Sequence, residues 1–161
     1  MRPQTKHGLW VILDHVTDPH NVGAIIRSGE CAGATALILP ERRSAGVNAT
    51  VRKAAAGAAA YVPIARVTNV AQSVRAMKKA GIWIAGAALS PGAVSYTRAD
   101  FNRDLAIVIG AEGAGISALV QRECDYLVSI PLEGKIASLN ASVSAGVLLY
   151  EALRQRMRLT N

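Results

Sequence analysis

Short apolar runs alternate with stretches of helical periodicity along the whole chain. The apolar runs are rich in β-branched residues and almost continuous, a pattern typical of strands that are covered on both faces. Strands that alternate with helices in this way predict an α/β fold with one parallel sheet and helices on both of its faces. The predicted strands are residues 9–13, 35–39, 61–67, 82–87, 105–109 and 126–130.

Asparagine or serine stands near the start of each segment with helical periodicity, where such side chains cap the first turn of a helix. Asn21 and Asn140 begin the first and the last of these segments, and Asn48, Asn69 and Ser117 begin the three between them. The predicted helices are residues 21–33, 48–59, 69–80, a short helix after residue 117, and 140–157.

The last predicted helix carries apolar side chains at steps of three and four residues, which form one stripe along it. The first interpretation of this stripe is packing against the core, and the second is the interface of a homodimer. Arginines gather at the end of the same helix, where positive charge suits the negative end of the helix dipole. The stripe consists of Val143, Val147, Tyr150, Leu153 and Met157, and the arginines are Arg154, Arg156 and Arg158.

Composition narrows the class of protein. With 161 residues, 51% of them hydrophobic and 18% charged, the chain is expected to form a single globular domain, residues 1–161. No apolar run is long enough to span a bilayer, and the run at residues 9–13 is too short for a signal peptide. Cys31 and Cys124 lack the close partners of a zinc site and are expected to be buried or half-buried thiols in a reducing cytoplasm.

An excess of basic residues points to a polyanionic partner. The chain has 18 lysines and arginines against 11 acidic residues, a formal net charge of +7, so nucleic acid is the first expectation. Aromatic residues make up only 4% of the chain, too few for a platform that stacks bases. If RNA is bound, phosphate contacts should therefore dominate in this domain.

Three of the segments that follow predicted strands are dense in polar residues and glycine. They are residues 14–27, 110–117 and 131–140. Ordinary connections are shorter and need less glycine. Because ligands of open α/β sheets bind beyond the carboxyl ends of the strands, these three segments predict one composite site.

Three local patterns suggest other kinds of site, and each fails on spacing. The glycines at residues 110–115 follow G-x-x-G-x-G rather than the dinucleotide fingerprint G-x-G-x-x-G, which argues against a nicotinamide-dependent oxidoreductase. Residues 134–136 (GKI) lack the serine or threonine of a phosphate-binding P-loop, which argues against a nucleotide hydrolase. The Asp/His turn at residues 14–20 lacks a diagnostic ligand spacing, so no metal is expected there.

The three polar segments, in this order, resemble the three motifs of the SpoU (TrmH-type) RNA 2′-O-ribose methyltransferases of the SPOUT superfamily. The first motif is Leu13-Asp14 followed by DPHNVGAIIRS at residues 18–28, and the second is IVIGAEGAGI at residues 107–116. The third is IPL at residues 130–132 with SLNASVS at residues 138–144. The resemblance covers residues 9–156, and residues 48–69 are similar to the bacterial 23S rRNA guanosine-2′-O-methyltransferase (RlmB-like) subgroup.

The resemblance implies a parallel sheet whose C-terminal part is threaded into a deep trefoil knot. It also implies that S-adenosyl-L-methionine lies bent in the knot, with Gly110, Ile130 and Leu139 in contact with it. Gly110 would let the backbone approach the ligand closely, and the two aliphatic side chains would sandwich an adenine. The reaction implied is transfer of a methyl group to a ribose 2′-hydroxyl of RNA, with a guanosine of 23S rRNA as the expected target.

The resemblance also implies the catalytic residues. Arg27 is the candidate that acts on the hydroxyl, with Asn21 and Glu112 positioning it and the ribose, and with Ser138 and Asn140 shaping the third-motif side of the site. Because arginine stays protonated in proteins, Arg27 is better suited to orient a phosphate and stabilise developing negative charge than to act as a base.

Several alternatives stay open. A non-catalytic RNA-binding module of the same fold would bind RNA without the cofactor, and a tRNA could replace rRNA as the substrate. Members of the family carry a small N-terminal RNA-recognition domain before this region, whereas this chain begins a few residues before the first motif. We therefore expect either a catalytic domain of a longer protein or a short natural form, active as a homodimer.

Overall fold

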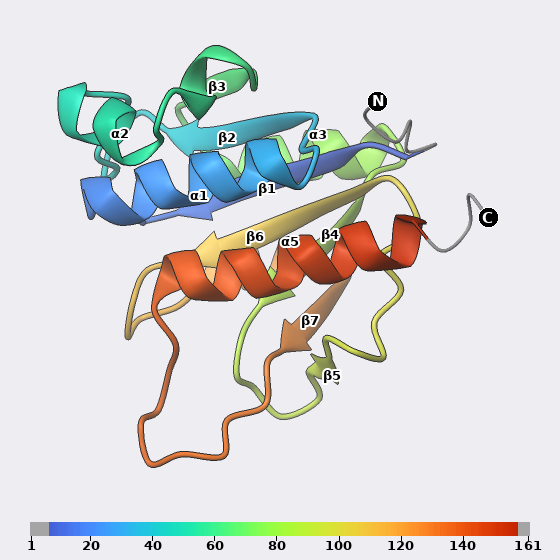
Figure 1. The fold of residues 1–161 in the computed structure, drawn as a ribbon. Coiled ribbons are helices and arrows are strands. Elements are labelled where there is room, and N and C mark those ends of the chain that lie inside the picture. Colours follow the sequence, from blue (N-terminus) through green and yellow to red (C-terminus); the bar gives the residue numbers. More distant parts are fainter. Residues whose placement is uncertain (1–6, 158–161) are drawn as a thin grey trace.

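The computed structural model describes residues 7–157, which are built around a seven-stranded sheet (Figure 1). All neighbouring strands are parallel, and the order across the sheet is β3-β2-β1-β6-β4-β7-β5. The strands are β1 (Leu9–Asp14), β2 (Ala36–Pro40), β3 (Ile64–Val67), β4 (Trp83–Ala87), β5 (Val94–Ser95), β6 (Leu105–Gly110) and β7 (Tyr126–Ser129).

Helices cover both faces of the sheet, as the sequence predicts. Two of them, α1 and α5, lie side by side on one face, and α3 lies behind the sheet in the same view (Figure 1). The helices are α1 (Pro19–Cys31), α2 (Ala49–Ala54), α3 (Val70–Lys79), α4 (Ala118–Glu123) and α5 (Ala141–Met157), with a 3-10 turn, η1 (Ala58–Ala60), after α2.

The alternation of side chains along each strand divides the core into two layers. Val11 and Leu13 of β1 are buried beneath α1, α2 and α5, whereas Ile12 between them is buried with the residues of α3 and α4. The central strands β1 and β6 are buried on both faces, which explains why their sequences are continuously apolar.

The first helix begins two residues earlier than predicted, and its cap is Asp18 rather than Asn21. The backbone N–H of His20 donates to Asp18 Oδ1 at 2.9 Å, and Pro19 occupies the first turn, where its missing N–H costs nothing. Asn21 therefore lies inside α1, where it is buried. The prediction that Asn21 caps the helix is wrong, and its side chain is available for other contacts.

Three of the other four predicted helix caps form a capping hydrogen bond, and one does not. Asn48, Asn69 and Asn140 each accept hydrogen bonds from backbone N–H groups of the following turn, so these predictions are confirmed. Ser117 stands at the cap position of α4, but its side chain makes no capping bond.

The prediction of a continuous helix from 48 to 59 is wrong. Helix α2 ends at Ala54, and the chain then takes left-handed conformations at Ala56 (φ 49°) and Gly57 (φ 85°). These two residues break the helical hydrogen-bond ladder, and only the short turn η1 follows. The two-residue strand β5 also differs from prediction, because it lies where the sequence suggests only a loop.

The apolar stripe predicted on the last helix is not the face that packs into the core. The buried face of α5 is instead made of small and aliphatic residues that alternate with the stripe: Ala141, Ala145, Leu148, Leu149 and Ala152. Val143, Tyr150 and Met157 of the stripe are 50%, 53% and 48% exposed. The first interpretation of the stripe is therefore wrong, and a large apolar face lies open on α5.

Arg156 is buried and links several segments of the chain, a role that differs from the predicted surface charge at the negative end of the helix dipole. It is only 5% exposed, and its guanidinium donates four hydrogen bonds of 2.8 to 3.1 Å to backbone carbonyls. Burial lowers the pKa of Arg156 from its usual value. The carbonyls belong to His7, Gly8, Phe101 and Arg103, so the end of α5 ties together the segments that precede β1 and β6.

The remaining arginines of α5 and the two cysteines differ in their exposure. Arg154 is exposed and pairs with Glu151, and Arg158 lies outside the described residues. Cys31 is exposed, contrary to the prediction of a buried thiol, whereas Cys124 is partly buried and burial raises its pKa to about 12. Within residues 7–157, no helix combines the length and the apolar character that a bilayer crossing requires.

We predict that Arg156→Met lowers the free energy of unfolding by about 3 kcal/mol, because it leaves four backbone carbonyls without their charged donor. Urea unfolding followed by circular dichroism would measure the loss. Arg98→Met is the control and should change stability very little, since Arg98 is exposed and its side chain makes no hydrogen bond or ion pair within residues 7–157. Equal losses from the two variants would contradict this role of Arg156.

Candidate active site

The loops after β4, β6 and β7 meet at one edge of the sheet, where the strand arrows in Figure 1 end, and they enclose a cavity of about 460 Å³. The composite site predicted from the sequence lies at this edge. The walls are mainly small and aliphatic residues, and Glu112 is the one charged side chain among the lining residues that the structure describes. Of the predicted site residues, five line the cavity: Gly110, Glu112, Ile130, Ser138 and Leu139.

A polar node beside the cavity joins the three predicted motifs through Glu112. Its Oε1 atom accepts hydrogen bonds from Asn21 Nδ2 at 3.0 Å, from Asn140 Nδ2, and from the backbone N–H of Ala141 at 3.4 Å. Asn140 Nδ2 also donates to Asn21 Oδ1 at 3.0 Å. Three side chains that are far apart in the sequence therefore hold one another, each from a different motif.

Asn140 serves two purposes in this node. Its amide group bonds Asn21 and Glu112, while its Oδ1 atom accepts from the backbone N–H of Ser142 at 2.9 Å and caps α5. The N-terminus of α5 is thereby fixed to the second and first motifs. Capping and site formation are carried by different atoms of one side chain.

Gly110 is required by the loop that follows it. A Cβ atom on Gly110 would overlap the backbone of Gly115 and Ile116. The loop folds back tightly: Gly115 N–H donates to Ala111 O at 2.8 Å, and Gly113 has a φ of 76°. The reason given from the sequence is therefore incomplete, because the missing side chain makes room for the protein's own backbone.

A comparison with known proteins identifies the family to which this arrangement belongs. The model of the SpoU rRNA methylase family matches residues 8–150. The chain belongs to the SpoU family.

Two curated relatives show how close the similarity is. The chain is 50% identical over 148 residues to the 23S rRNA (guanosine-2′-O-)-methyltransferase RlmB of Ralstonia nicotianae, covering 92% of this chain and 59% of that protein. It is 49% identical over 146 residues to RlmB of Escherichia coli, covering 91% of this chain and 60% of that protein. The chain thus spans about three fifths of the length of these relatives.

Solved structures of SpoU proteins share the fold. The methyltransferase AviRb from Streptomyces viridochromogenes, in complex with AdoMet, superposes with a TM-score of 0.87 at 35% identity, over 97% of this chain and 63% of that one. The TrmH/SpoU tRNA modifying enzyme of A. aeolicus superposes with a TM-score of 0.89 at 31% identity, over 98% of this chain and 79% of that one. The predicted family and its parallel α/β sheet are confirmed.

Asp14 is a site-forming residue of this SpoU chain that the sequence analysis placed in the first motif but to which it gave no role. Its carboxylate is only 1% exposed, and it accepts from the backbone N–H of Ser117 at 2.7 Å and from His15 Nδ1 at 2.8 Å. Asp14 is paired with Gly110 across β1 and β6. It therefore fixes the far end of the loop that Gly110 begins. A carboxylate directly after an apolar strand was the available signal.

Arg27 is the one predicted site residue that belongs neither to the node nor to the cavity wall. It lies six residues after Asn21 on α1, so the two side chains point about 120° apart around the helix. It shares a face of α1 with Gly23, four residues earlier. Arg27 is exposed, does not line the cavity, and makes no hydrogen bond or ion pair within residues 7–157.

The Asp/His turn at residues 14–20 is accounted for by protein contacts. Asp14 holds Ser117 and His15, and Asp18 caps α1. In the part of the chain that the structure describes, no three His, Cys, Asp or Glu side chains gather as metal ligands would.

We predict that Gly110→Ala lowers the free energy of unfolding by about 2 kcal/mol or more, because the added methyl group overlaps backbone atoms that cannot move independently. Gly134→Ala is the control, since a Cβ there meets nothing within 4 Å. It should change stability by less than about 0.5 kcal/mol. Denaturant unfolding of both variants would decide; a tolerated Gly110→Ala would disprove the steric argument.

Proposed function

We propose that this chain is the catalytic domain of an S-adenosyl-L-methionine-dependent methyltransferase that acts on a ribose 2′-hydroxyl of RNA. The observation that carries the proposal is the node of Asn21, Glu112 and Asn140 beside a cavity of ligand size. All three family motifs contribute a side chain to it. A non-catalytic RNA-binding module would have no need of this arrangement.

The cavity fits the proposed cofactor in size and in charge. Its volume of about 460 Å³ lies within the range of about 300–1,000 Å³ usual for small-molecule sites. Glycine and alanine in its walls expose backbone N–H and C=O groups, and Ile130 and Leu139 offer apolar surface for an adenine. Because Glu112 is the one charged residue among the described residues that line it, the cavity suits a sulfonium cation better than the pyrophosphate of a dinucleotide.

The proposed residue roles follow from these positions. The cofactor supplies an activated methyl group when bound. Gly110, Ile130 and Leu139 hold it, while Asn21, Glu112 and Asn140 fix the loops around it and orient the ribose. Ser138 places a hydroxyl in the wall of the cavity. Arg27 binds an RNA phosphate and stabilises negative charge, and its permanent protonation means that another group accepts the hydroxyl proton.

The names of the relatives support a guanosine of 23S rRNA as the target, because both curated relatives above are 23S rRNA guanosine methyltransferases. Such a substrate would place the protein in the cytoplasm. A tRNA is the second candidate, since the superposed A. aeolicus enzyme is named as a tRNA-modifying enzyme.

A trefoil knot is part of the proposal. Strand β7 lies between β4 and β5, and the segment that follows it lines the same cavity as the loop after β4. These neighbours are what a chain threaded through its own loop requires. The loop after β4 and the segment after β7 would then together hold the cofactor.

We predict that S-adenosyl-L-methionine binds the purified chain saturably in a calorimetric titration, whereas NAD does not. The reason is charge, because the described lining residues include the Glu112 carboxylate and no cation, so the negative pyrophosphate of NAD would be repelled. Gly134→Ala should bind like the parent chain. Binding of NAD alone would overturn the proposed function.

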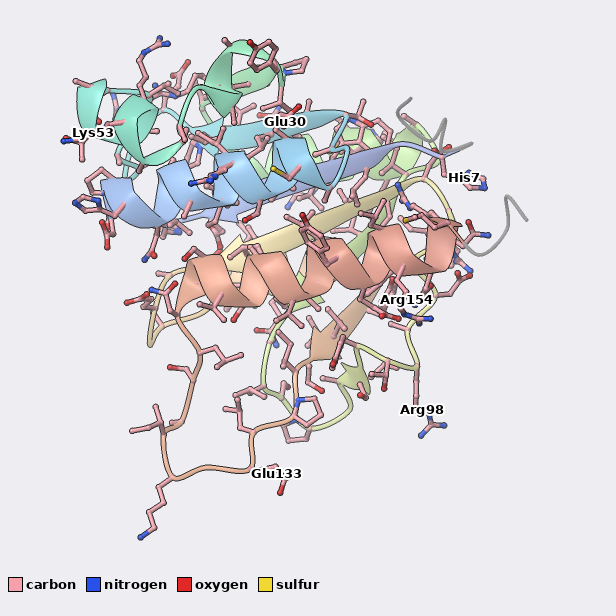
Figure 2. The ribbon with its side chains drawn as sticks, viewed as in Figure 1. His7, Glu30, Lys53, Arg98, Glu133 and Arg154 are labelled. Atoms are coloured by element: carbon pink, nitrogen blue, oxygen red, sulfur yellow. The ribbon has the colours of Figure 1, made fainter. Side chains whose placement is uncertain are left out.

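We predict that Arg27→Ala reduces methyl transfer to 23S rRNA by about 100-fold or more and leaves the affinity for S-adenosyl-L-methionine unchanged, because Arg27 lies outside the cavity. Incorporation of labelled methyl into the RNA measures the first effect and calorimetry the second. Arg98→Ala is the control, because Arg98 is exposed and lies far from the edge of the sheet at which α1 begins (Figure 2). Retained activity in Arg27→Ala would remove Arg27 from the reaction.

We propose that the active unit is a homodimer joined through the open face of α5. Val143, Val147, Tyr150, Leu153 and Met157 form a continuous apolar stripe, and three of them are about half exposed. Contiguous apolar patches on protein surfaces mark interaction sites. A second copy of the same helix would match such a surface in chemistry and in length.

We predict that Tyr150→Glu dissociates the dimer to monomers in sedimentation equilibrium, because it buries a charge in an apolar interface. Tyr61→Glu is the matched control: Tyr61 is 74% exposed, against 53% for Tyr150, and lies after η1. It should leave the dimer intact. A monomeric parent chain at micromolar concentration would refute the dimer.

A further inference from the structure

Four basic residues fall within the short segment between β2 and the end of α2. Arg42 and Arg43 lie in the loop that follows β2, and Arg52 and Lys53 lie on α2. All four are exposed, and residues 42–53 contain no acidic residue. Glu41 immediately precedes the segment, and its backbone carbonyl accepts a hydrogen bond from Arg66. We call the four side chains the α2 basic surface.

The α2 basic surface is not neutralised by the protein itself. None of its four side chains makes a hydrogen bond or an ion pair within residues 7–157. Some other cations are held by carboxylates, such as Arg75 by Glu123 at 2.9 Å and Lys78 by Asp125 at 3.1 Å, on the opposite face of the sheet. Four unpaired cations therefore fall within twelve residues of sequence that hold no acidic residue, whereas the other exposed and unpaired cations, such as Lys79 and Arg98, stand singly along the chain.

The α2 basic surface is close to the polar node. Helix α2 packs against α1 so tightly that a Cβ on Gly23 would overlap the backbone of Val51 and the side chain of Ala54. Gly23 is two residues after Asn21, within the same turn of α1. Figure 2 shows Lys53 at the end of the molecule where α1 begins, at the edge that holds the cavity.

Arg27 continues the positive charge along α1. It lies one turn beyond Gly23 on the same face, the face against which α2 packs. A strand of nucleic acid that enters the node would therefore meet Arg27 and α2 on one side of α1. Such a path is lined by arginines, which bind phosphate oxygens through two parallel N–H groups.

We propose that Arg42, Arg43, Arg52 and Lys53 bind the phosphate backbone of the RNA strand that flanks the target nucleotide. This inference rests on the proposed function, because it takes RNA as the substrate of the neighbouring site. The contacts are to phosphates rather than to bases, so they set the position and the affinity of the RNA but not the target sequence.

Two charge-matched triple variants test the α2 basic surface. One is R42Q/R43Q/K53Q, and the other is K79Q/R98Q/R122Q, which removes exposed, unpaired cations from other faces of the same domain. Binding of a fluorescein-labelled RNA hairpin is followed by anisotropy at several salt concentrations. Calorimetry with S-adenosyl-L-methionine is run on all three proteins.

We expect the first triple variant to lose most of its RNA affinity at low salt. The plot of log affinity against log salt should flatten by about 0.7 for each phosphate that the protein no longer neutralises, about 2 in total. The second triple variant should keep the parent slope, and both should bind the cofactor as the parent does.

Equal effects of the two variants on RNA binding would contradict the proposal that the α2 basic surface binds RNA, since net charge alone would then explain the binding. An unchanged slope in R42Q/R43Q/K53Q, or no RNA binding by a parent chain that binds the cofactor, would overturn it as well. Failure of the parent chain to bind S-adenosyl-L-methionine would instead count against the proposed function, while the comparison of RNA slopes would still decide the surface.

Discussion

One carboxylate oxygen holds the site together. Glu112 Oε1 accepts from Asn21, from Asn140 and from the backbone of Ala141, so a single atom joins α1, the loop after β6 and the start of α5. Hydrogen bonds to a charged acceptor are about twice as strong as neutral ones. Without this acceptor, the amide groups of the two asparagines would still meet, but the loop after β6 would lose its link to both helices.

The parallel sheet makes that meeting possible. Because every strand runs the same way, all connections after the strands emerge at one edge, and β1 and β6 lie side by side at its centre. Asp14 and Gly110 end these two strands as a register pair. Asp14 then holds Ser117 at the far end of the loop that Gly110 starts, so the cavity wall is closed at both ends by the central strands.

The sequence predicted the sheet, the family and the edge that holds the site, because apolar runs and motif spacing are local signals. It did not predict the break after Ala54, since an alanine with positive φ at position 56 leaves no trace in a run of alanines. The strand of Val94 and Ser95 is too short to show alternation. Helix α5 is apolar on both sides, so periodicity alone could not distinguish its core face from its exposed face. The burial of Arg156 was not predictable either, because the four carbonyls that it bonds come from distant segments.

The negative and positive side chains at this edge of the sheet lie in two different places, one suited to the proposed cofactor and the other to the proposed RNA. The cavity contains a carboxylate and no cation among its described lining residues, whereas the cations lie unpaired beyond α1, on α2 and in the loop before it. A cationic cofactor and a polyanionic RNA would thus be attracted to different places, and phosphates would be repelled from the cavity itself. Asn21 lies between these two parts of the edge. It is buried on α1 and donates to Glu112, and two residues later Gly23 contacts α2. Under the proposed function, the reacting ribose would lie at this boundary between the two parts, because its hydroxyl could reach the cavity there while its phosphates stay with the arginines.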